Sequence, residues 1–391
     1  MNNHLLHTEV QKFINNNLNS DISKILFKGT NFSNVTTQEI VEQIVSKKKC
    51  KNKLPTWFET QNIYYPDKLN IEQTSSEITS QYKANLVSGS NLIDITGGFG
   101  VDTFAFSKKV KQVFHCEINE QLSKISKHNF QIFNATNIKI TQENGLDYLK
   151  NYTEKFDWIY IDPSRRNDIK GKVFLLKDCL PNVPENIDFL FENSDNILIK
   201  NSPILDISSA INELKFVKEI HIVAIQNEVK ELLFILEKNY KNSIQIKTIN
   251  IQKNNNQLFD FELNKECIPT YNLTKKYLYE PNVSILKSGG FNEVSSQFKI
   301  DKLHPNSHLY TSEKLIEFPG RKFEIKHLIS FDKKQLKKLI PSGKANITTR
   351  NFPQTVAQIR KKTKLKDGGN QYLFFTTDIN EKHIVLICDK V

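Results

Sequence analysis

One short run constrains the fold of this chain more than any other, the segment 91–103 with the sequence NLIDITGGFGVDT. An apolar stretch ends at Asp94, and three glycines follow at Gly97, Gly98 and Gly100 before a helical pattern begins. Glycine has no Cβ, so the backbone can turn sharply there and approach a ligand closely. A strand that leads through glycines into a helix start is typical of a nucleoside-binding crevice. The run therefore predicts an α/β fold with a ligand at the end of a strand.

The carboxylate inside the turn indicates which nucleoside cofactor fits. Asp94 would repel a pyrophosphate but suits a cationic amino-acid moiety, which favours S-adenosylmethionine. The dinucleotide pattern G-x-G-x-x-G is also broken, because Thr103 stands at the third glycine position when the pattern is read from Gly98. A lone glycine turn is often purely structural, so the prediction depends on the strands that follow.

Three later apolar runs end in polar or glycine residues in the same way. The carboxyl ends of parallel strands lie along one edge of a sheet, where ligands bind. Glu117 comes about twenty residues after the glycines, the separation at which a carboxylate reaches ribose hydroxyls. The predicted cofactor contacts are Asp94, Thr96, Gly97, Gly98, Gly100, Asp102, Glu117, Ile118, Asn144, Gly145 and Asp162.

Two apolar runs near the middle of the chain give an independent indication of the fold. Only about five polar residues separate 219–225 from 231–236, too few for a helical crossover, so the two must pair antiparallel. A parallel sheet that ends in an antiparallel hairpin is the architecture of methyltransferases. Nicotinamide dehydrogenases do not normally end in this way.

These segments resemble the class I S-adenosylmethionine-dependent methyltransferases, whose first motif is acid-x-Gly-x-Gly-x-Gly. In this chain Asp94, Gly98 and Gly100 match that motif, Thr96 replaces its first glycine and Gly97 is an additional one. The resemblance implies a Rossmann-like, seven-stranded methyltransferase sheet with an antiparallel terminal hairpin.

A narrower resemblance is to a bacterial group with an Asp-Pro-Ser-Arg-Arg motif and a C-terminal THUMP-like domain. It is carried by 72–83, 96–103 and 162–166 and by the tail from 349 to 369, and it covers most of the chain beyond about Lys53. The expected domains are an N-terminal helical region (1–86), the methyltransferase domain (87–240), a small β-rich, ferredoxin-like unit (241–320) and a basic THUMP-like domain (321–391).

The segment Asp162-Pro-Ser-Arg-Arg166 is the predicted place of the chemistry. Asp162 at a strand end can accept the proton of the nucleophile, and the Pro163 carbonyl can accept a hydrogen bond from an exocyclic amine. Compared with the Asp/Asn-Pro-Pro-aromatic loop of amino-methylating enzymes, Ser164 replaces the second proline and Arg165 the aromatic residue. Arg165 and Arg166 suit a phosphate or carboxylate of the substrate. The alternative for this pair is a structural salt bridge to Asp94, Asp102 or Asp147.

Positive charge is concentrated at the end of the chain. The net charge is +11, and residues 321–391 hold 16 Lys and Arg against 6 Asp and Glu, a net +10. A compositional bias towards lysine would spread this excess evenly, so the concentration indicates a polyanion-binding module. We expect RNA, with Arg350, Arg360 and Lys361 among its contacts.

Composition bounds the remaining possibilities. The chain has neither an apolar run of membrane-spanning length nor a signal-peptide pattern, so we expect a cytoplasmic location and no membrane partner. Its five cysteines form no C-x-x-C pair, so we expect no metal site. The predicted function is S-adenosylmethionine-dependent methylation of RNA (tRNA or rRNA). The alternatives are a methyltransferase of a small molecule or protein, and a non-catalytic RNA-binding scaffold. The oligomeric state is left open.

Overall fold

The computed structural model describes residues 1–165 and 175–391, and of Arg165 only the backbone. The chain divides into two compact units, each described here by itself. Unit 1 comprises residues 1–218 and 233–241, and unit 2 comprises residues 219–232 and 242–391.

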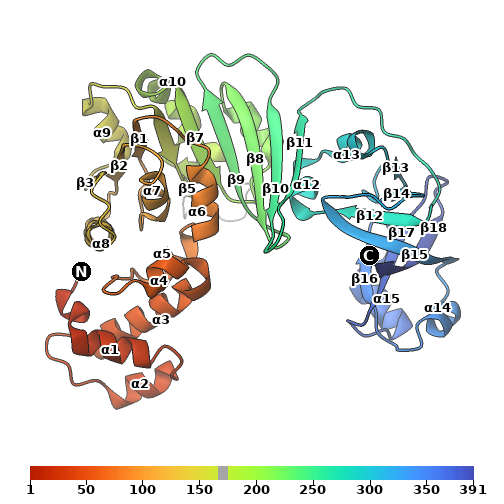
Figure 1. The fold of residues 1–391 in the computed structure, drawn as a ribbon, viewed down its shortest axis with the longest axis horizontal. Helices are drawn as coiled ribbons and strands as arrows, with labels where there is room; N and C mark the ends of the chain where they lie inside the picture. The colour runs from red at the N-terminus through yellow and green to blue at the C-terminus, as the bar shows by residue number, and fades with distance from the viewer. Residues whose placement is uncertain (166–174) are drawn as a thin grey trace. The chain divides into compact units, whose positions relative to one another are not determined.

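Helices form the first part of unit 1 (Figure 1). They are α1 (Thr8–Asn16), α2 (Ile22–Lys28), α3 (Thr37–Lys53), α4 (Pro55–Glu59), α5 (Lys68–Gln73) and α6 (Glu77–Ala84), after a 3-10 turn at Asn3–Leu6. Thr36 begins α3 with a capping box to Glu39, and the Ser76 hydroxyl accepts from the Thr79 N–H at the start of α6. One hydrophobic cluster joins these helices to the glycine turn, because it contains both Trp57 and Phe99.

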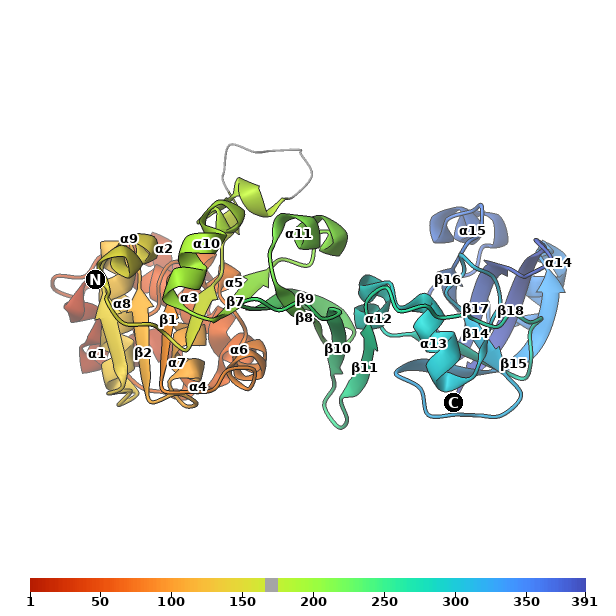
Figure 2. The same cartoon turned by 90° about the horizontal axis from the view of Figure 1, so that it is seen from above.

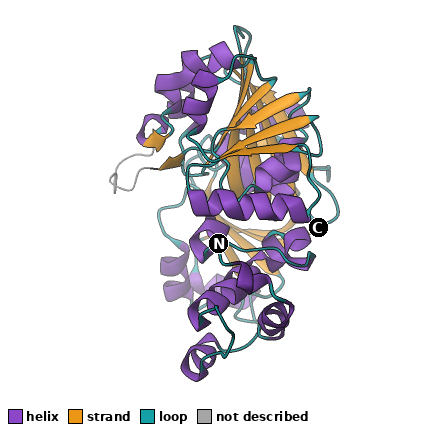
Figure 3. Ribbon diagram, turned by 90° about the vertical axis from the view of Figure 1, so that its left-hand side faces the viewer, coloured by secondary structure: helices purple, strands orange, loops and turns teal. Residues whose placement is uncertain are grey.

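The central sheet has nine strands in the order β11-β10-β8-β9-β7-β4-β1-β2-β3, and Figure 3 shows them fanning with the usual twist. The strands are β1 (Asn91–Asp94), β2 (Gln112–Cys116), β3 (Ile138–Thr141), β4 (Trp158–Ile161), β7 (Asn196–Asn201), β8 (Val217–Ile225), β9 (Glu228–Glu237), β10 (Gln245–Ile251) and β11 (Gln257–Glu262). The run β3-β2-β1-β4-β7 is parallel throughout. The predicted parallel α/β sheet is therefore confirmed.

Helices cover both faces of the parallel strands, and the apolar residues of these strands are buried most completely in β1, β2, β4 and β7. They are α7 (Val101–Phe106), α8 (Glu120–Ile132), α9 (Gly145–Asn151), α10 (Val183–Asn193) and α11 (Ile207–Glu213). In Figure 2, α10 and α11 lie on one side of the sheet and α6 and α7 on the other. Two short strands, β5 (Ser164–Arg165) and β6 (Cys179–Leu180), pair antiparallel after the end of β4, and a 3-10 turn spans Leu176–Asp178.

The connection between β8 and β9 forms the predicted hairpin. Gln226 and Asn227 both have positive φ, as a tight two-residue hairpin turn requires. The Glu237 N–H donates to the Phe216 carbonyl oxygen at 3.1 Å, in register with that turn. The antiparallel end of the sheet is thus confirmed.

The sheet continues for two strands beyond the seven that the sequence predicts. β10 pairs in parallel with β8, Ile246 opposite Ile220, and β11 pairs antiparallel with β10. The small β-rich unit expected to begin at 241 therefore contributes two strands to the first sheet. Alternating apolar residues identify them as strands but do not say which sheet they join.

Unit 2 contains a second sheet of seven strands in the order β13-β14-β12-β15-β18-β17-β16. Its elements are β12 (Tyr277–Pro281), α12 (Val283–Ser288), α13 (Phe291–Phe298), β13 (Asp301–Lys302), β14 (Tyr310–Ser312), β15 (Gly320–Ser330), α14 (Lys333–Leu339), β16 (Asn346–Thr349), α15 (Val356–Thr363), β17 (Gln371–Thr377) and β18 (His383–Lys390). Leu336 of α14 and Ile359 of α15 pack on one face of this sheet with Phe375. Because β12 pairs with β15, the segments before and after residue 320 share one sheet.

Candidate active site

The glycine turn after β1 is built from three glycines with different tasks. A Cβ on Gly97 would lie 2.3 Å from His115 Cε1, and one on Gly100 would lie 2.4 Å from Phe130 Cζ. A Cβ on Gly98 would meet only the Thr96 carbonyl oxygen at 3.8 Å, although Gly98 has φ +58°. Gly97 and Gly100 are therefore required for packing. Gly98 is required for its conformation, and the space beside it stays open.

This difference gives a stability prediction. Gly97→Ala forces the new methyl group onto a buried imidazole, and we expect a loss of about 3 kcal/mol in the free energy of unfolding. In Gly98→Ala the only cost is the strain of alanine in the left-handed conformation, which should lower the free energy of unfolding by about 1 kcal/mol. Urea denaturation of both variants measures the difference, and equal losses would contradict these separate tasks.

Asp94 lies at the end of β1 and is 1% exposed. Its Oδ1 accepts from the Thr96 N–H at 3.0 Å, and its Oδ2 accepts from the Thr103 hydroxyl at 2.7 Å. The same hydroxyl lies 2.8 Å from His115 Nδ1, and burial lowers the pKa of His115 to about 3, so this imidazole is neutral. Burial also raises the pKa of Asp94 to about 7, although its hydrogen bonds favour the ionised form. Asp94 is thus a carboxyl group that changes charge near neutral pH.

Glu117 links the glycine turn to the end of β2. Its two carboxylate oxygens accept from the Gly98 N–H at 2.8 Å and from the Asn119 N–H at 2.7 Å. The next residue, Ile118, is 70% exposed and lines the same cleft as Glu117. A carboxylate beside an exposed apolar side chain suits a sugar and its attached base.

The ends of β3 and β4 complete this edge of the sheet. The Asn144 side chain accepts from the Leu146 N–H at 2.9 Å and so caps α9. A Cβ on Gly145 would lie 2.4 Å from Ile95 Cβ, so only glycine fits there. The Asp162 N–H donates to Thr96 Oγ1 at 2.8 Å, which ties the end of β4 to the glycine turn.

The carboxylate of Asp162 forms an ion pair that the sequence analysis did not predict. Lys200 Nζ, at the end of β7, lies 2.5 Å from Asp162 Oδ2. The side chain of Lys200 is 14% exposed and that of Asp162 is 33% exposed, so both groups are mostly shielded from water. The rule that polar residues at strand ends face the ligand could have identified Lys200, because it ends the apolar run 196–200.

A second ion pair, between Lys83 and Asp102, is more deeply buried than the first. Lys83 Nζ is 3.2 Å from Asp102 Oδ1, and its side chain is not exposed at all. Asp102 Oδ2 accepts from the Ser75 hydroxyl and from the Tyr160 hydroxyl, both at 2.7 Å. Burial alone would favour the neutral acid, but Lys83 and Lys200 hold the pKa of Asp102 below its usual range. Asp102 is therefore a permanent anion beneath the glycine turn.

These residues surround one cleft of about 1020 Å³ in unit 1. Of the predicted cofactor contacts, it is lined by Asp94, Thr96, Gly97, Gly98, Asp102, Glu117, Ile118, Asn144, Gly145 and Asp162. Gly100 does not line it, and Pro163 is buried rather than exposed to it. The volume is that of a site for a nucleoside-sized ligand with room for a second group.

Comparison with known proteins shows the family of the chain. A protein from Porphyromonas gingivalis W83, named as a "putative methyltransferase", has a crystal structure that matches with a TM-score of 0.87. The two sequences are 31% identical, and the match covers 98% of each chain. The chain belongs to this methyltransferase family. Two family profiles match unit 2, a ferredoxin-like domain over residues 277–319 and a THUMP domain-like domain over residues 320–390.

A curated relative matches a shorter part of this chain. It is described as an uncharacterised RNA methyltransferase of Thermotoga maritima and is 30% identical over 97 residues. The match covers 25% of this chain and 22% of that protein.

Among the described residues, no helix combines the length and the apolar character needed to cross a bilayer.

The predicted arginine contacts have different outcomes in the structure. Arg166 lies outside the described residues, and the side chain of Arg165 is not described. Their proposed structural partners Asp102 and Asp147 are paired with Lys83 at 3.2 Å and Lys150 at 2.8 Å. Contacts of Arg165 and Arg166 with a substrate stay predictions.

The tail residues lie in unit 2 and divide into two kinds. Arg350 Nη2 is 2.9 Å from Glu280 Oε1, and Arg360 pairs with Asp367 and donates to the Ala345 carbonyl oxygen at 3.2 Å. Arg350 therefore links the THUMP-like domain to β12 of the ferredoxin-like domain, and Arg360 stabilises the THUMP-like domain itself. The exposed lysines nearby are Lys333, Lys334, Lys337, Lys338, Lys361, Lys362, Lys364 and Lys366.

Proposed function

We propose that this chain is an S-adenosylmethionine-dependent methyltransferase whose cofactor occupies the cleft at the end of β1. The supporting observation is that one cleft brings Asp94, Glu117 and Asp162 together around the open side of Gly98. The cofactor supplies a methyl group on a cationic sulfur. Asp94 would hold the cationic amino-acid part, and Glu117 with Ile118 would hold the ribose and the base.

The chain's own residues then have the tasks of orientation and proton acceptance. Methyl transfer is an in-line displacement, so alignment of the nucleophile contributes most of the rate. Lys200 and the Asp162 N–H contact with Thr96 hold Asp162 in one orientation. Its carboxylate can then accept the proton that the nucleophile loses.

The proposed substrate is RNA. The THUMP-like profile and the RNA methyltransferase relative support this class. The eight exposed lysines around α14 and α15 form no ion pair with any other described residue, so their charge is available to a phosphate backbone.

Transfer of a labelled methyl group tests this function directly. We expect S-adenosylmethionine with a tritiated methyl group to label total RNA from a strain that lacks this gene. RNA from the parent strain is the control, and it should accept little label because its sites are already modified. Label found only in protein or in small molecules would contradict an RNA substrate. The absence of label from every fraction would contradict the proposed methyltransferase activity.

The contribution of the basic helices can be measured without truncating the chain. Deletion from residue 321 would remove β15, the partner of β12, so charge variants are the better test. We expect K361Q/K362Q to weaken RNA binding and to reduce the slope of log affinity against log salt by about 1.5. The matched control K24Q/K28Q removes two exposed lysines of α2 and should change neither quantity. Equal effects of the two double variants would contradict a role for α15.

Cofactor affinity should depend on pH through Asp94. Its pKa of about 7 means that much of the carboxyl group is protonated in the free protein at neutral pH. The ammonium group of the ligand pairs with the ionised form of Asp94, so we expect affinity for S-adenosylhomocysteine to rise about tenfold from pH 6 to pH 8. The same raised pKa stabilises the fold at acidic pH, and this contribution is lost as the pH rises through 7. Calorimetry of Asp94→Asn should show an affinity for S-adenosylhomocysteine that does not change with pH. If the affinity of this variant rose with pH as steeply as that of the unchanged protein, another titrating group would cause the pH dependence.

A further inference from the structure

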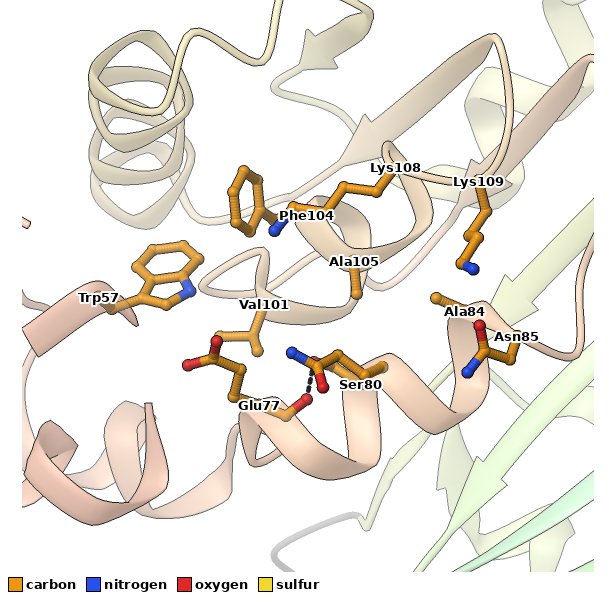
Figure 4. A pocket seen from close by; sticks show the side chains of 11 residues that line it. Trp57, Glu77, Ser80, Ala84, Asn85, Val101, Phe104, Ala105, Lys108 and Lys109 are labelled. Atoms are coloured by element: carbon orange, nitrogen blue, oxygen red, sulfur yellow. Dashed lines mark hydrogen bonds between the residues drawn. The ribbon is translucent and has the colours of Figure 1, made fainter. Parts of the chain in front are cut away.

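A second pocket in unit 1 lies outside the cleft, between α4, α6 and α7 (Figure 4). Its volume is about 410 Å³, and among its lining residues it shares only Val101 with the cleft. Its walls are apolar at Val101, Phe104 and Ala105. This volume is within the usual range of small-molecule sites.

One end of the pocket presents a hydrogen-bond donor beside an acceptor. Trp57 is 1% exposed, its indole N–H has no hydrogen-bond partner among the described residues, and Figure 4 shows that nitrogen on the pocket side of the ring. This N–H faces the pocket without a partner in the described part of the chain, so it is available as a donor to a ligand. The neighbouring carboxylate of Glu77 accepts from the Thr56 N–H at 3.0 Å and from the Thr56 hydroxyl, which holds it in place.

Positive charge borders the rest of the pocket. Lys108 Nζ lies 4.3 Å from the centroid of the Phe104 ring, and Lys109 lies near Asn85 in Figure 4. Both lysines are exposed at their outer ends, and neither forms an ion pair with another described residue. Two ammonium groups against one carboxylate that is already hydrogen-bonded favour an anionic ligand.

We propose that this pocket binds a nucleoside monophosphate whose base carries an amino group next to a ring nitrogen. The amino group donates to Glu77, and the ring nitrogen accepts from the Trp57 N–H. The flat base lies along Val101 and Ala105. The phosphate pairs with Lys109 near Asn85, and Lys108 over the Phe104 ring adds positive charge. Such a base edge, as in adenine or cytosine, presents the donor and acceptor that this end of the pocket requires.

The site is placed to influence the cleft. Val101 forms part of both walls, and the Trp57 ring lies 4.6 Å, centroid to centroid, from the ring of Phe99 in the glycine turn. A ligand against Trp57 therefore contacts a residue that packs on the cofactor turn. The pocket and its ligand can be measured without methyl transfer, and only the use of S-adenosylhomocysteine to fill the cleft rests on the proposed function.

Titration of the full chain with AMP tests this site. The chain has two tryptophans, so Trp158→Phe leaves Trp57 as the only indole fluorophore. We expect AMP to quench Trp57 with saturation and uridine monophosphate to bind about tenfold more weakly, because uracil lacks the amino group. Saturating S-adenosylhomocysteine is present throughout to fill the cleft, and calorimetry on the unaltered chain repeats the measurement without Trp158→Phe.

Charge variants test whether Lys108 and Lys109 bind the phosphate group. Lys108→Ala with Lys109→Ala should weaken AMP about tenfold or more. Lys111→Ala removes an exposed lysine of the same segment that does not line the pocket, and it should leave the affinity unchanged. The proposal would be overturned by the absence of saturable AMP binding, by equal affinity for uridine monophosphate, or by equal losses in the two lysine variants.

Discussion

Asp162→Asn is expected to lower kcat for methyl transfer by about 10²- to 10⁴-fold while the protein stays folded. The amide has the same shape and keeps the backbone contact of residue 162 with Thr96, but it cannot take up the proton of the nucleophile. Steady-state kinetics with S-adenosylmethionine and RNA measure the loss. The matched control is Asp147→Asn, an exposed carboxylate that does not line the cleft, and it should change nothing.

Lys200 gives the companion measurement to Asp162. Lys200→Met removes the ammonium that holds the carboxylate, so we expect kcat to fall with little change in the KM of the cofactor. Lys200→Arg keeps a positive charge and should recover part of the rate. If both Lys200 variants kept full activity, Lys200 would not position Asp162. If Asp162→Asn kept full activity, another group would accept the proton.

The largest stability effect is expected at Lys83. Lys83→Met leaves the buried Asp102 carboxylate without the ion-pair partner 3.2 Å away, and we expect a loss of about 3–5 kcal/mol in the free energy of unfolding. The Ser75 and Tyr160 hydroxyls still donate to Asp102, but neither carries a charge. Urea denaturation monitored by circular dichroism gives the value.

Two further variants separate the buried pair from the loss of a lysine in general. Lys150→Met removes a lysine whose pair with Asp147 is exposed, with relative side-chain exposures of 62% and 53%, and it should have little effect. Asp102→Asn added to Lys83→Met should restore part of the loss, because the buried charge is then gone. A Lys83→Met loss no larger than that of Lys150→Met would show that the buried pair does not stabilise the fold.

The sequence predicted the local features of this fold because each has a local cause. The apolar strands, the glycine turn and the antiparallel pairing of 219–225 with 231–236 are set by neighbouring residues, and all three occur. The connection is shorter than expected, with two residues, Gln226 and Asn227, in place of about five. The pairing of β10 with β8 was not predicted, because the choice of sheet depends on the exposed edge of β8 and not on the residues of β10 and β11.

In the candidate site, too, features with a local cause could be predicted and contacts between distant elements could not. Residues at the ends of strands could be named from the sequence, since parallel topology brings those ends together. The pairs Lys200–Asp162 and Lys83–Asp102 could not be named, because they join residues 38 and 19 positions apart on different elements. Arg350 and Arg360 were predicted from charge alone, and charge does not show that Glu280 and Asp367 already pair with them.

Calorimetric titration with S-adenosylmethionine and S-adenosylhomocysteine tests the central claim most directly. The account predicts saturable binding of one molecule per chain, weakened at least about tenfold by Glu117→Ala through loss of the ribose contact. Glu120→Ala, an exposed neighbour on α8 that does not line the cleft, should bind as the unchanged protein does. Absence of saturable heat with both ligands, in a protein that is folded by circular dichroism, would contradict the account.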